Sequence, residues 1–193
     1  MRKRNETVED KSSKEMLLIR AVIDGDKNEF AAIVDRYKDM VYSILFRMVN
    51  EHEEANDLAQ EVFIKVYRKL QQFKGDAKLS TWIYKIAYFE GLSYLRKHKR
   101  WNNSSYQVEV ESEENMEKDW AVDALQEHVT ECIYALKPME RTAITLFYLD
   151  ELAVKEVADI MNITESYVKV TVHRAKKKLR QRIKKEYYEE ARG

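Results

Sequence analysis

Apolar residues recur at three- and four-residue intervals along most of the chain, with polar residues between them, which is the pattern of amphipathic helices. The chain has only 4 Gly and 1 Pro, so helices are favoured over a sheet. The first half is predicted to form four helices, over residues 17–25, 26–50, 53–73 and 80–99. Asp26 is the expected cap of the second of these helices, and Ser80 or Thr81 is the expected cap of the fourth.

This periodicity stops in the middle of the chain, in a polar and acidic stretch that cannot bury enough apolar surface to fold. The helical pattern resumes near Trp120, restarts at Pro138 and continues to Leu149. We therefore predict an all-α fold with two helical domains joined by a flexible acidic linker. The predicted parts are a disordered N-terminus (1–14), a first domain (15–101), the linker (102–119) and a second domain (120–189).

Residues 154–188 read as a short helix, a tight turn and a long basic helix, which is the pattern of a helix-turn-helix DNA-binding motif. Asn162, Ile163 and Thr164 form the predicted turn. One side of the long helix is apolar and is predicted to face protein: Val168, Val172, Ala175, Leu179 and Ile183. The opposite side is predicted to face an anion: Ser166, Lys169, His173, Arg174, Lys177, Arg180 and Lys184.

Charge is segregated along the chain although the formal net charge is zero. An acidic stretch, interrupted only by Lys118, extends from Glu109 to Asp123. Such segregation favours nucleic-acid binding by the basic helix, and a solvated terminal helix is the alternative. From Ser166 to Lys185 no residue is acidic and nine are basic: Lys169, Arg174, Lys176, Lys177, Lys178, Arg180, Arg182, Lys184 and Lys185.

The third predicted helix has two different sides. Leu58, Val62, Val66 and Leu70 recur every four residues and form the predicted buried stripe, with Phe63 beside it. Another side of the same helix carries an acidic and amide surface around one isoleucine, made of Asp57, Gln60, Glu61, Ile64 and Arg68. This surface is either a solvated face or a docking site for a partner helix that carries Arg or Lys.

The fourth predicted helix mixes aromatic and basic residues. Aromatic rings stack on unpaired bases and neighbouring cations hold phosphates, so this mixture suits single-stranded DNA. Core packing is the competing explanation for Trp82, Ile83 and Ile86. The aromatic residues are Trp82, Tyr84, Tyr88, Phe89 and Tyr94, and the basic ones are Lys85, Arg96, Lys97, Lys99 and Arg100.

Several classes of protein are disfavoured. The single cysteine, Cys132, excludes an internal disulfide and suits a reducing compartment. No apolar run approaches the roughly 20 residues that span a bilayer, so we expect a cytoplasmic protein without direct membrane insertion. The 4 His are scattered, and no zinc motif, Gly-rich phosphate loop or nucleophile elbow is present. We therefore predict no enzyme, no catalytic residue, no metal and no cofactor.

In order along the chain, three motifs resemble the extracytoplasmic-function (ECF) sigma factors of bacterial RNA polymerase. They are DLAQEVF from Asp57, STWIYKIA from Ser80 with LRKHKR after it, and the stretch from Leu136 to Leu179. The resemblance extends from about Phe30 to Ile183. It implies a subunit that docks on core polymerase and directs promoter recognition, DNA melting and transcription initiation.

The resemblance also implies roles for particular residues. The beta-prime clamp helices would bind Asp57, Gln60, Glu61 and Ile64. The minus-ten promoter element would bind Trp82, Lys85, Tyr88, Phe89, Arg96, Lys97, Lys99 and Arg100. The minus-thirty-five element would bind Ser166, Lys169, Val170, His173, Arg174 and Lys177. The second domain would contact the beta flap, and an anti-sigma factor is an implied partner.

The chain departs from the family pattern at a few positions. Tyr88 and Phe89 replace a common Arg-Asn pair, Ser93 replaces Asp, and Thr171 replaces a customary Arg of the recognition helix. Promoter sequence preference is therefore not carried over with the resemblance. The alternative function is a stand-alone helix-turn-helix regulator, which would usually dimerise across two half-sites and would leave the aromatic-basic helix unexplained.

Overall fold

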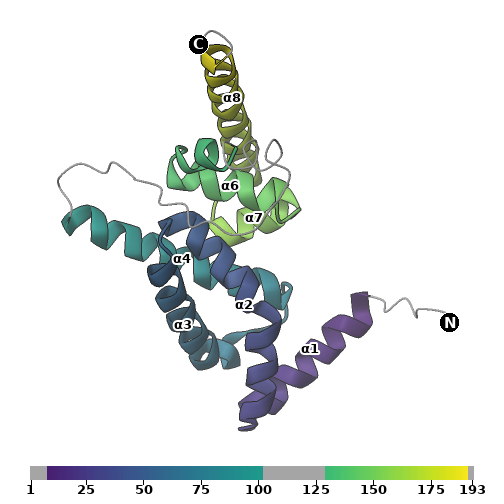
Figure 1. Ribbon diagram of the computed structural model, residues 1–193. Helices are drawn as coiled ribbons and strands as arrows, with labels where there is room; N and C mark the ends of the chain where they lie inside the picture. The colour runs from purple at the N-terminus through teal and green to yellow at the C-terminus, as the bar shows by residue number, and fades with distance from the viewer. Residues whose placement is uncertain (1–7, 102–128, 191–193) are drawn as a thin grey trace, which may run out of the picture. The chain divides into compact units, whose positions relative to one another are not determined.

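The computed structural model describes the backbone of residues 8–101 and 129–190 and the side chains of residues 15–98 and 129–183 (Figure 1). Over this part of the chain every regular element is a helix, which confirms the predicted all-α class. The chain divides into two compact units, with the main division after Gly91 in α4. The predicted linker and the expected helix start at Trp120 lie outside the described residues.

The first unit contains α1 (Val8–Ile23), α2 (Lys27–Val49), α3 (His52–Lys69), the short 3-10 helix η1 (Leu70–Gln72) and the first part of α4 (Leu79–Trp101). Helix α2 packs against both α1 and α3. A Cβ on Gly91 would lie 2.8 Å from Met48, so the missing side chain is what lets α4 approach α2 closely. The largest fully buried side chains of this unit include Ile19, Ile33, Ile44, Leu45, Leu70, Leu79, Ile83 and Tyr88.

Local turn chemistry explains most of the helix ends. Gly25, with φ of +106°, separates α1 from α2, and the Asn28 N–H donates to the Asp26 carboxylate at 2.9 Å. Asn50 ends α2 in the left-handed conformation, with φ of 58°. The predicted cap at Asp26 is therefore confirmed.

Two predicted boundaries were wrong. Helix α1 begins at Val8, inside the segment predicted to be disordered. Helix α4 begins at Leu79, so neither Ser80 nor Thr81 precedes it as a cap. The Thr81 side chain is buried inside the helix packing rather than exposed at a helix end. Leu79, Thr81 and Ile83 in the first turns of α4 are all buried, so the start of this helix packs into the unit.

The second unit contains the last part of α4, a helical segment at residues 129–134, α6 (Pro138–Tyr148), most of α7 (Val154–Met161) and α8 (Glu165–Glu190). Pro138 occupies the first turn of α6, as predicted, where its missing N–H costs nothing. Helices α6 and α8 pack together, and their core joins Leu136, Ile144 and Ala175, with Leu179 against it. Lys178 of α8 pairs with Glu140 of α6 at 2.7 Å.

Candidate protein-docking and nucleic-acid surfaces

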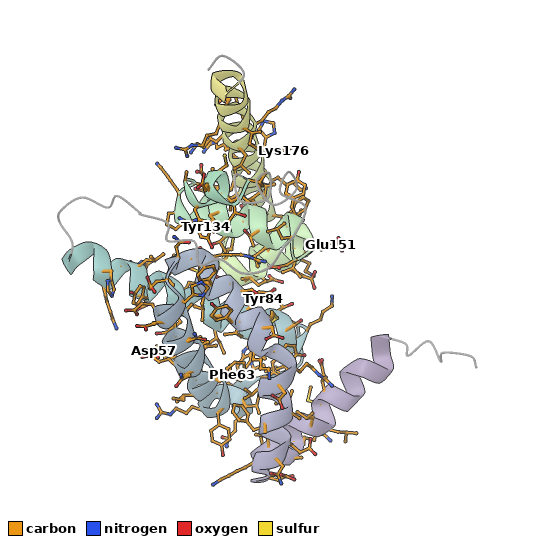
Figure 2. The ribbon with its side chains drawn as sticks, in the orientation of Figure 1. Asp57, Phe63, Tyr84, Tyr134, Glu151 and Lys176 are labelled. Carbon is orange, nitrogen blue, oxygen red and sulfur yellow. The ribbon has the colours of Figure 1, made fainter. Side chains whose placement is uncertain are left out.

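The outer face of α3 carries the predicted docking residues. Leu58, Val62, Val66 and Leu70 are all buried, so the predicted stripe is confirmed. Asp57 and Phe63 leave α3 on different sides (Figure 2), and Phe63 is buried. The opposite face is exposed along its length, and it consists of Asp57, Gln60, Glu61 and Ile64.

Ile64 is 52% exposed, which is unusual for an isoleucine in the middle of an amphipathic helix. Tyr67, one turn further along α3, is 44% exposed and meets Phe30 edge-on at 4.9 Å between ring centroids. Sequence reasoning missed Tyr67, although its three-residue spacing from Ile64 could have found it. The acidic and amide surface is thus bordered by an apolar strip, a composition suited to a protein partner.

A groove of about 550 Å³ lies between α3 and α4. Its α4 side carries the half-buried Trp82, whose ring lies 5.5 Å from that of Phe73, and the 40% exposed Phe89. Lys65 of α3 forms an ion pair across the groove with Glu90 of α4. The lining residues are Lys65, Arg68, Lys69, Gln72, Trp82, Lys85, Ile86, Phe89 and Glu90.

The structure brings together three of the predicted minus-ten residues, Trp82, Lys85 and Phe89, in this groove. Arg96 and Lys97 are exposed further along α4, and the side chains of Lys99 and Arg100 lie outside the described set. The prediction for Tyr88 was wrong, because its side chain is only 1% exposed. Tyr88 follows the buried Tyr84 by one turn on the inward side of α4, so its ring is part of the core.

Four polar residues of the groove were not predicted as DNA contacts: Lys65, Arg68, Lys69 and Gln72. The spacing of Lys65, Arg68 and Lys69 places them on one face of α3, which the sequence could have shown, and Gln72 follows in η1. Only the packing of α3 beside α4 reveals that this face lies opposite Trp82 and Phe89. The groove therefore combines cations from two helices with two accessible rings, a composition common in sites for single-stranded nucleic acid.

The helix-turn-helix is present as predicted. Asn162 ends α7 in the left-handed conformation, with φ of 54°, and the Tyr167 N–H donates to Thr164 Oγ1 at 3.2 Å to cap α8. Val168, Val172 and Ala175 are buried. All six predicted DNA residues of α8 are exposed: Ser166, Lys169, Val170, His173, Arg174 and Lys177. Thr171, which departs from the family pattern, is buried and does not join this outward face.

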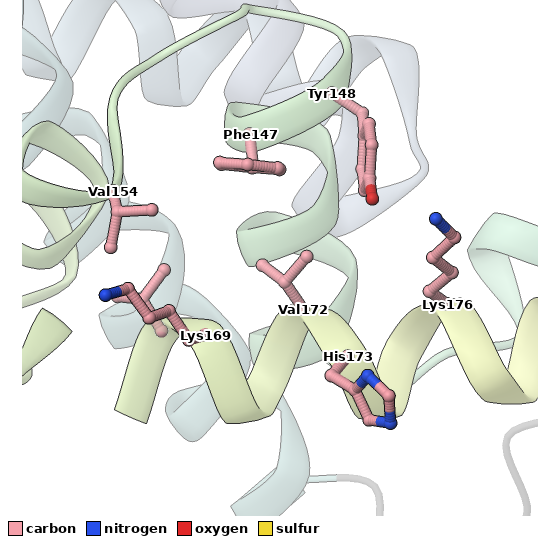
Figure 3. Close-up of a pocket in the computed structure, with 8 residues that line it drawn as sticks. Phe147, Tyr148, Val154, Lys169, Val172, His173 and Lys176 are labelled. Atoms are coloured by element: carbon pink, nitrogen blue, oxygen red, sulfur yellow. The ribbon is translucent and has the colours of Figure 1, made fainter. Parts of the chain in front are cut away.

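A smaller groove of about 230 Å³ lies between α6 and α8 (Figure 3). Phe147 and Tyr148 come from α6, and Lys176 of α8 lies 5.6 Å from the centre of the Tyr148 ring. Tyr148 and Leu149 at the end of α6 are 47% and 56% exposed. Sequence reasoning did not find this groove, because its two walls are distant in the chain. The residues that line it are Phe147, Tyr148, Val154, Val168, Lys169, Val172, His173 and Lys176.

Other predicted features are placed as follows. Cys132 is buried. His52 is hydrogen bonded to the Tyr42 hydroxyl at 2.5 Å and stacks on Phe46, and His98 stacks on Tyr94. Across the described side chains, His, Cys, Asp and Glu form no group that could hold a metal ion. None of the helices in the described ranges is long and apolar enough to cross a membrane.

Comparison with known proteins identifies the family. The model of sigma-70 region 2 matches residues 33–101, and that of sigma-70 region 4 matches residues 126–179. The ECF RNA polymerase sigma factor SigW of Bacillus subtilis is 33% identical over 181 residues, which cover 86% of this chain and 95% of that protein. This chain belongs to the ECF sigma factors. The ECF sigma-E factor of Escherichia coli K12 is 32% identical over 181 residues, an alignment that covers 88% of this sigma factor and 94% of that protein.

Solved structures show the same fold as this ECF sigma factor. The sigma factor RpoE of Bartonella quintana, in complex with the anti-sigma factor NepR, aligns with a TM-score of 0.67 at 23% identity, over 81% of this chain and 97% of that one. CnrH, in complex with the cytosolic domain of CnrY, aligns with a TM-score of 0.64 at 18% identity, over 87% of this chain and 96% of that one. The face on α3 and the groove beside it lie within the region 2 match, and the exposed basic face of α8 up to Lys177 lies within the region 4 match.

Proposed function

We propose that this sigma factor docks on core RNA polymerase through the outer face of α3, defined by Asp57, Gln60, Glu61 and Ile64. The supporting observation is that all four of these side chains are exposed while the opposite stripe of the same helix is buried. Carboxylates around an exposed isoleucine suit a helix that carries Arg or Lys, such as the beta-prime clamp helices that the family docks on. Tyr67 and Phe30 extend the surface with apolar area.

The groove between α3 and α4 is proposed to hold the melted minus-ten strand. Trp82 and Phe89 offer rings for stacking, and Arg68, Lys69 and Lys85 supply the positive charge that attracts phosphates, while Lys65 is paired with Glu90. Arg96 and Lys97, with Lys99 and Arg100 of the same sequence cluster, would hold the DNA backbone beyond the groove. The buried Tyr88 has no part in this contact.

Helix α8 is proposed to read the minus-thirty-five element in the major groove. Its exposed side carries Ser166, Lys169, Val170, His173, Arg174 and Lys177, and the opposite side is held against α6 and the rest of the unit. This is the docking geometry of helix-turn-helix proteins, in which the second helix enters the groove. Lysine and arginine contacts to phosphate would position the helix, and contacts to base edges would give specificity.

The groove between α6 and α8 is proposed to receive an apolar segment of the beta flap. Phe147, Tyr148 and Val154 give it an apolar wall opposite the α8 side, which carries Lys169, His173 and Lys176, and the neighbouring Leu149 is exposed. An exposed apolar patch of this kind typically marks a protein-binding site. An anti-sigma factor is a further proposed partner, since the family is usually held off DNA by one.

This sigma factor is proposed to act in the cytoplasm, with polymerase and DNA, and to have no catalytic activity of its own. The similarity to ECF sigma factors over most of the chain does not favour the stand-alone regulator. The single observation that carries the proposal is the presence of both sigma regions in one chain, each with its outward face exposed.

The direct test is transcription in vitro from a genomic library, with core polymerase and the purified chain, followed by sequencing of the RNA start sites. We expect a defined set of promoters that core polymerase alone does not use. The control replaces the chain with a variant that carries Asp57→Lys and Glu61→Lys, which should give the start sites of core polymerase alone. Identical start sites with and without the chain would refute the proposal.

A further inference from the structure

Glu90 is an unexpected residue in the groove between α3 and α4. Among the nine described residues that line the groove, four are cationic and only Glu90 is acidic. A carboxylate in a site for a polyanion repels phosphate, so it weakens binding of nucleic acid unless it also makes a specific favourable contact. The Glu90 side chain is only 13% exposed and is held by the ion pair with Lys65 across the groove.

The position of Glu90 on α4 suggests what that contact is. At 100° per residue, the groove-facing residues of α4 follow one another around the helix as Lys85, Phe89, Trp82, Ile86 and Glu90. The rings of Phe89 and Trp82 therefore lie in the middle of this side, with a cation at one edge and a carboxylate at the other. A base stacked on either ring would present its hydrogen-bonding edge to one of these charged groups.

We propose that Glu90 selects a base with an amino group in the single-stranded minus-ten element, and that it favours cytosine over thymine. This inference rests on the proposed function of the groove. The carboxylate can only accept hydrogen bonds, so it pairs with the cytosine N4 amino group and repels the thymine O4 carbonyl. The ion pair with Lys65 of α3 fixes the Glu90 carboxylate at the groove, where it would meet the edge of a base stacked on a neighbouring ring.

The test uses holoenzyme assembled from core polymerase and the full chain, bound to forked promoter DNA with a single-stranded non-template overhang. Each overhang position carries dC or dU in turn, because neither base has the C5 methyl group of thymine and the two differ only on the edge formed by ring position 4 and N3, where cytosine has an amino group and an acceptor and uracil a carbonyl and a donor. We expect one position at which dC is preferred about tenfold, and we expect Glu90→Gln to reduce that preference to about twofold or less. Glutamine keeps an oxygen that accepts from Lys65 and adds a donor for the O4 carbonyl, so the variant retains the fold while losing the discrimination.

The matched control is Asp39→Asn, which removes one negative charge from an exposed position on α2, outside the groove. This control should keep the dC preference, and thermal unfolding should show that both variants are folded. The inference is overturned if no overhang position favours dC or if Glu90→Gln keeps the preference. It is also overturned if Glu90→Gln strengthens binding to the dC and dU overhangs equally. A holoenzyme that fails to form, or that ignores every forked DNA, would instead refute the proposed function itself.

Discussion

Helices α3 and α8 bury similar stripes but present opposite charge to the outside. On α3 the buried residues Leu58, Val62 and Val66 face away from an acidic and amide surface. On α8 the buried Val168 and Val172 face away from a basic one. The shared spacing of four residues makes both helices pack, whereas the residues between decide what each can bind.

The two helices also differ in how many surfaces they offer. Helix α3 has a second exposed side, with Lys65, Arg68 and Lys69, that lies beside α4 and lines the larger groove. One helix thus carries a face suited to a protein partner and a face suited to nucleic acid. This arrangement would couple polymerase docking to the grip on the melted strand, because a single rigid element carries both surfaces.

The largest expected effect comes from reversing the charge on α3. We expect Asp57→Lys with Glu61→Lys to abolish co-purification with core polymerase, a loss of about 4 kcal/mol or more, because cations would then face cations. Both residues are exposed, so circular dichroism should show an unchanged fold. The control is Asp35→Lys with Asp39→Lys on α2, which changes the net charge equally. Co-purification retained by the α3 variant would remove the docking surface.

Two adjacent residues of α3, one buried and one exposed, allow a test of which side of the helix packs into the core. Leu58 is 6% exposed, and Leu58→Ala should lower the free energy of unfolding by about 3 kcal/mol, since it leaves a cavity in the core. Its neighbour Asp57 is exposed, and Asp57→Ala should change that free energy by about 0.5 kcal/mol or less. Urea unfolding measures both values. Equal effects from the two substitutions would contradict the assignment of faces.

The basic face of α8 is tested by the salt dependence of binding to minus-thirty-five DNA. If about six cations contact phosphates, the slope of log affinity against log salt should have a contribution of roughly minus five from α8. Lys169→Ala or Arg174→Ala should make the slope about one unit less steep and weaken binding, with core polymerase docking unchanged. The exposed Lys38 of α2 gives the control, Lys38→Ala, which should keep the wild-type slope. A slope unaffected by both α8 substitutions would argue against phosphate contacts.

The smallest expected effect concerns the interior of the first unit. Burial, followed by the hydrogen bond to Glu15 at 2.8 Å, raises the pKa of Tyr37 from 10.0 to about 12. The folded chain therefore holds the phenol proton more tightly than the unfolded chain. The resulting stabilisation is complete below pH 10 and is lost as pH rises toward 12.

Tyr37→Phe should lower the free energy of unfolding at neutral pH by about 1 kcal/mol, through loss of the hydrogen bond. It should also flatten the decline of stability with pH over the same alkaline range, as measured by urea unfolding. The exposed Tyr148 provides the control, Tyr148→Phe, which should leave the pH profile unchanged. A steep alkaline decline that persists in Tyr37→Phe would assign the effect to other groups.

Sequence reasoning succeeded where structure follows from neighbouring residues. The boundaries of α7, the turn at Asn162 and the start of α6 at Pro138 all match the prediction, because caps, left-handed residues and proline act within one turn of the helix. The buried stripe of α3 was predicted for the same reason, since an apolar side recurring every four residues has to pack against something.

Sequence reasoning failed where a second element decides. Tyr88 was predicted to contact DNA because of its aromatic and basic neighbours, but packing of α4 places it in the core. The start of α4 at Leu79 was missed because the polar side chains of Ser80 and Thr81 suggested a cap one or two residues later. Neither groove could be predicted, because the two walls of each come from separate helices.

By itself the sequence determined that the chain is helical, the buried stripes of α3 and α8 and the sign of the charge opposite each stripe, because helical periodicity fixes which side chains share a face. Tertiary structure alone decided which exposed faces lie opposite one another, as Lys65 and Glu90 do, and which aromatic rings remain accessible. The reason is that such a meeting depends on how two helices pack, and neither helix carries that information in its own spacing.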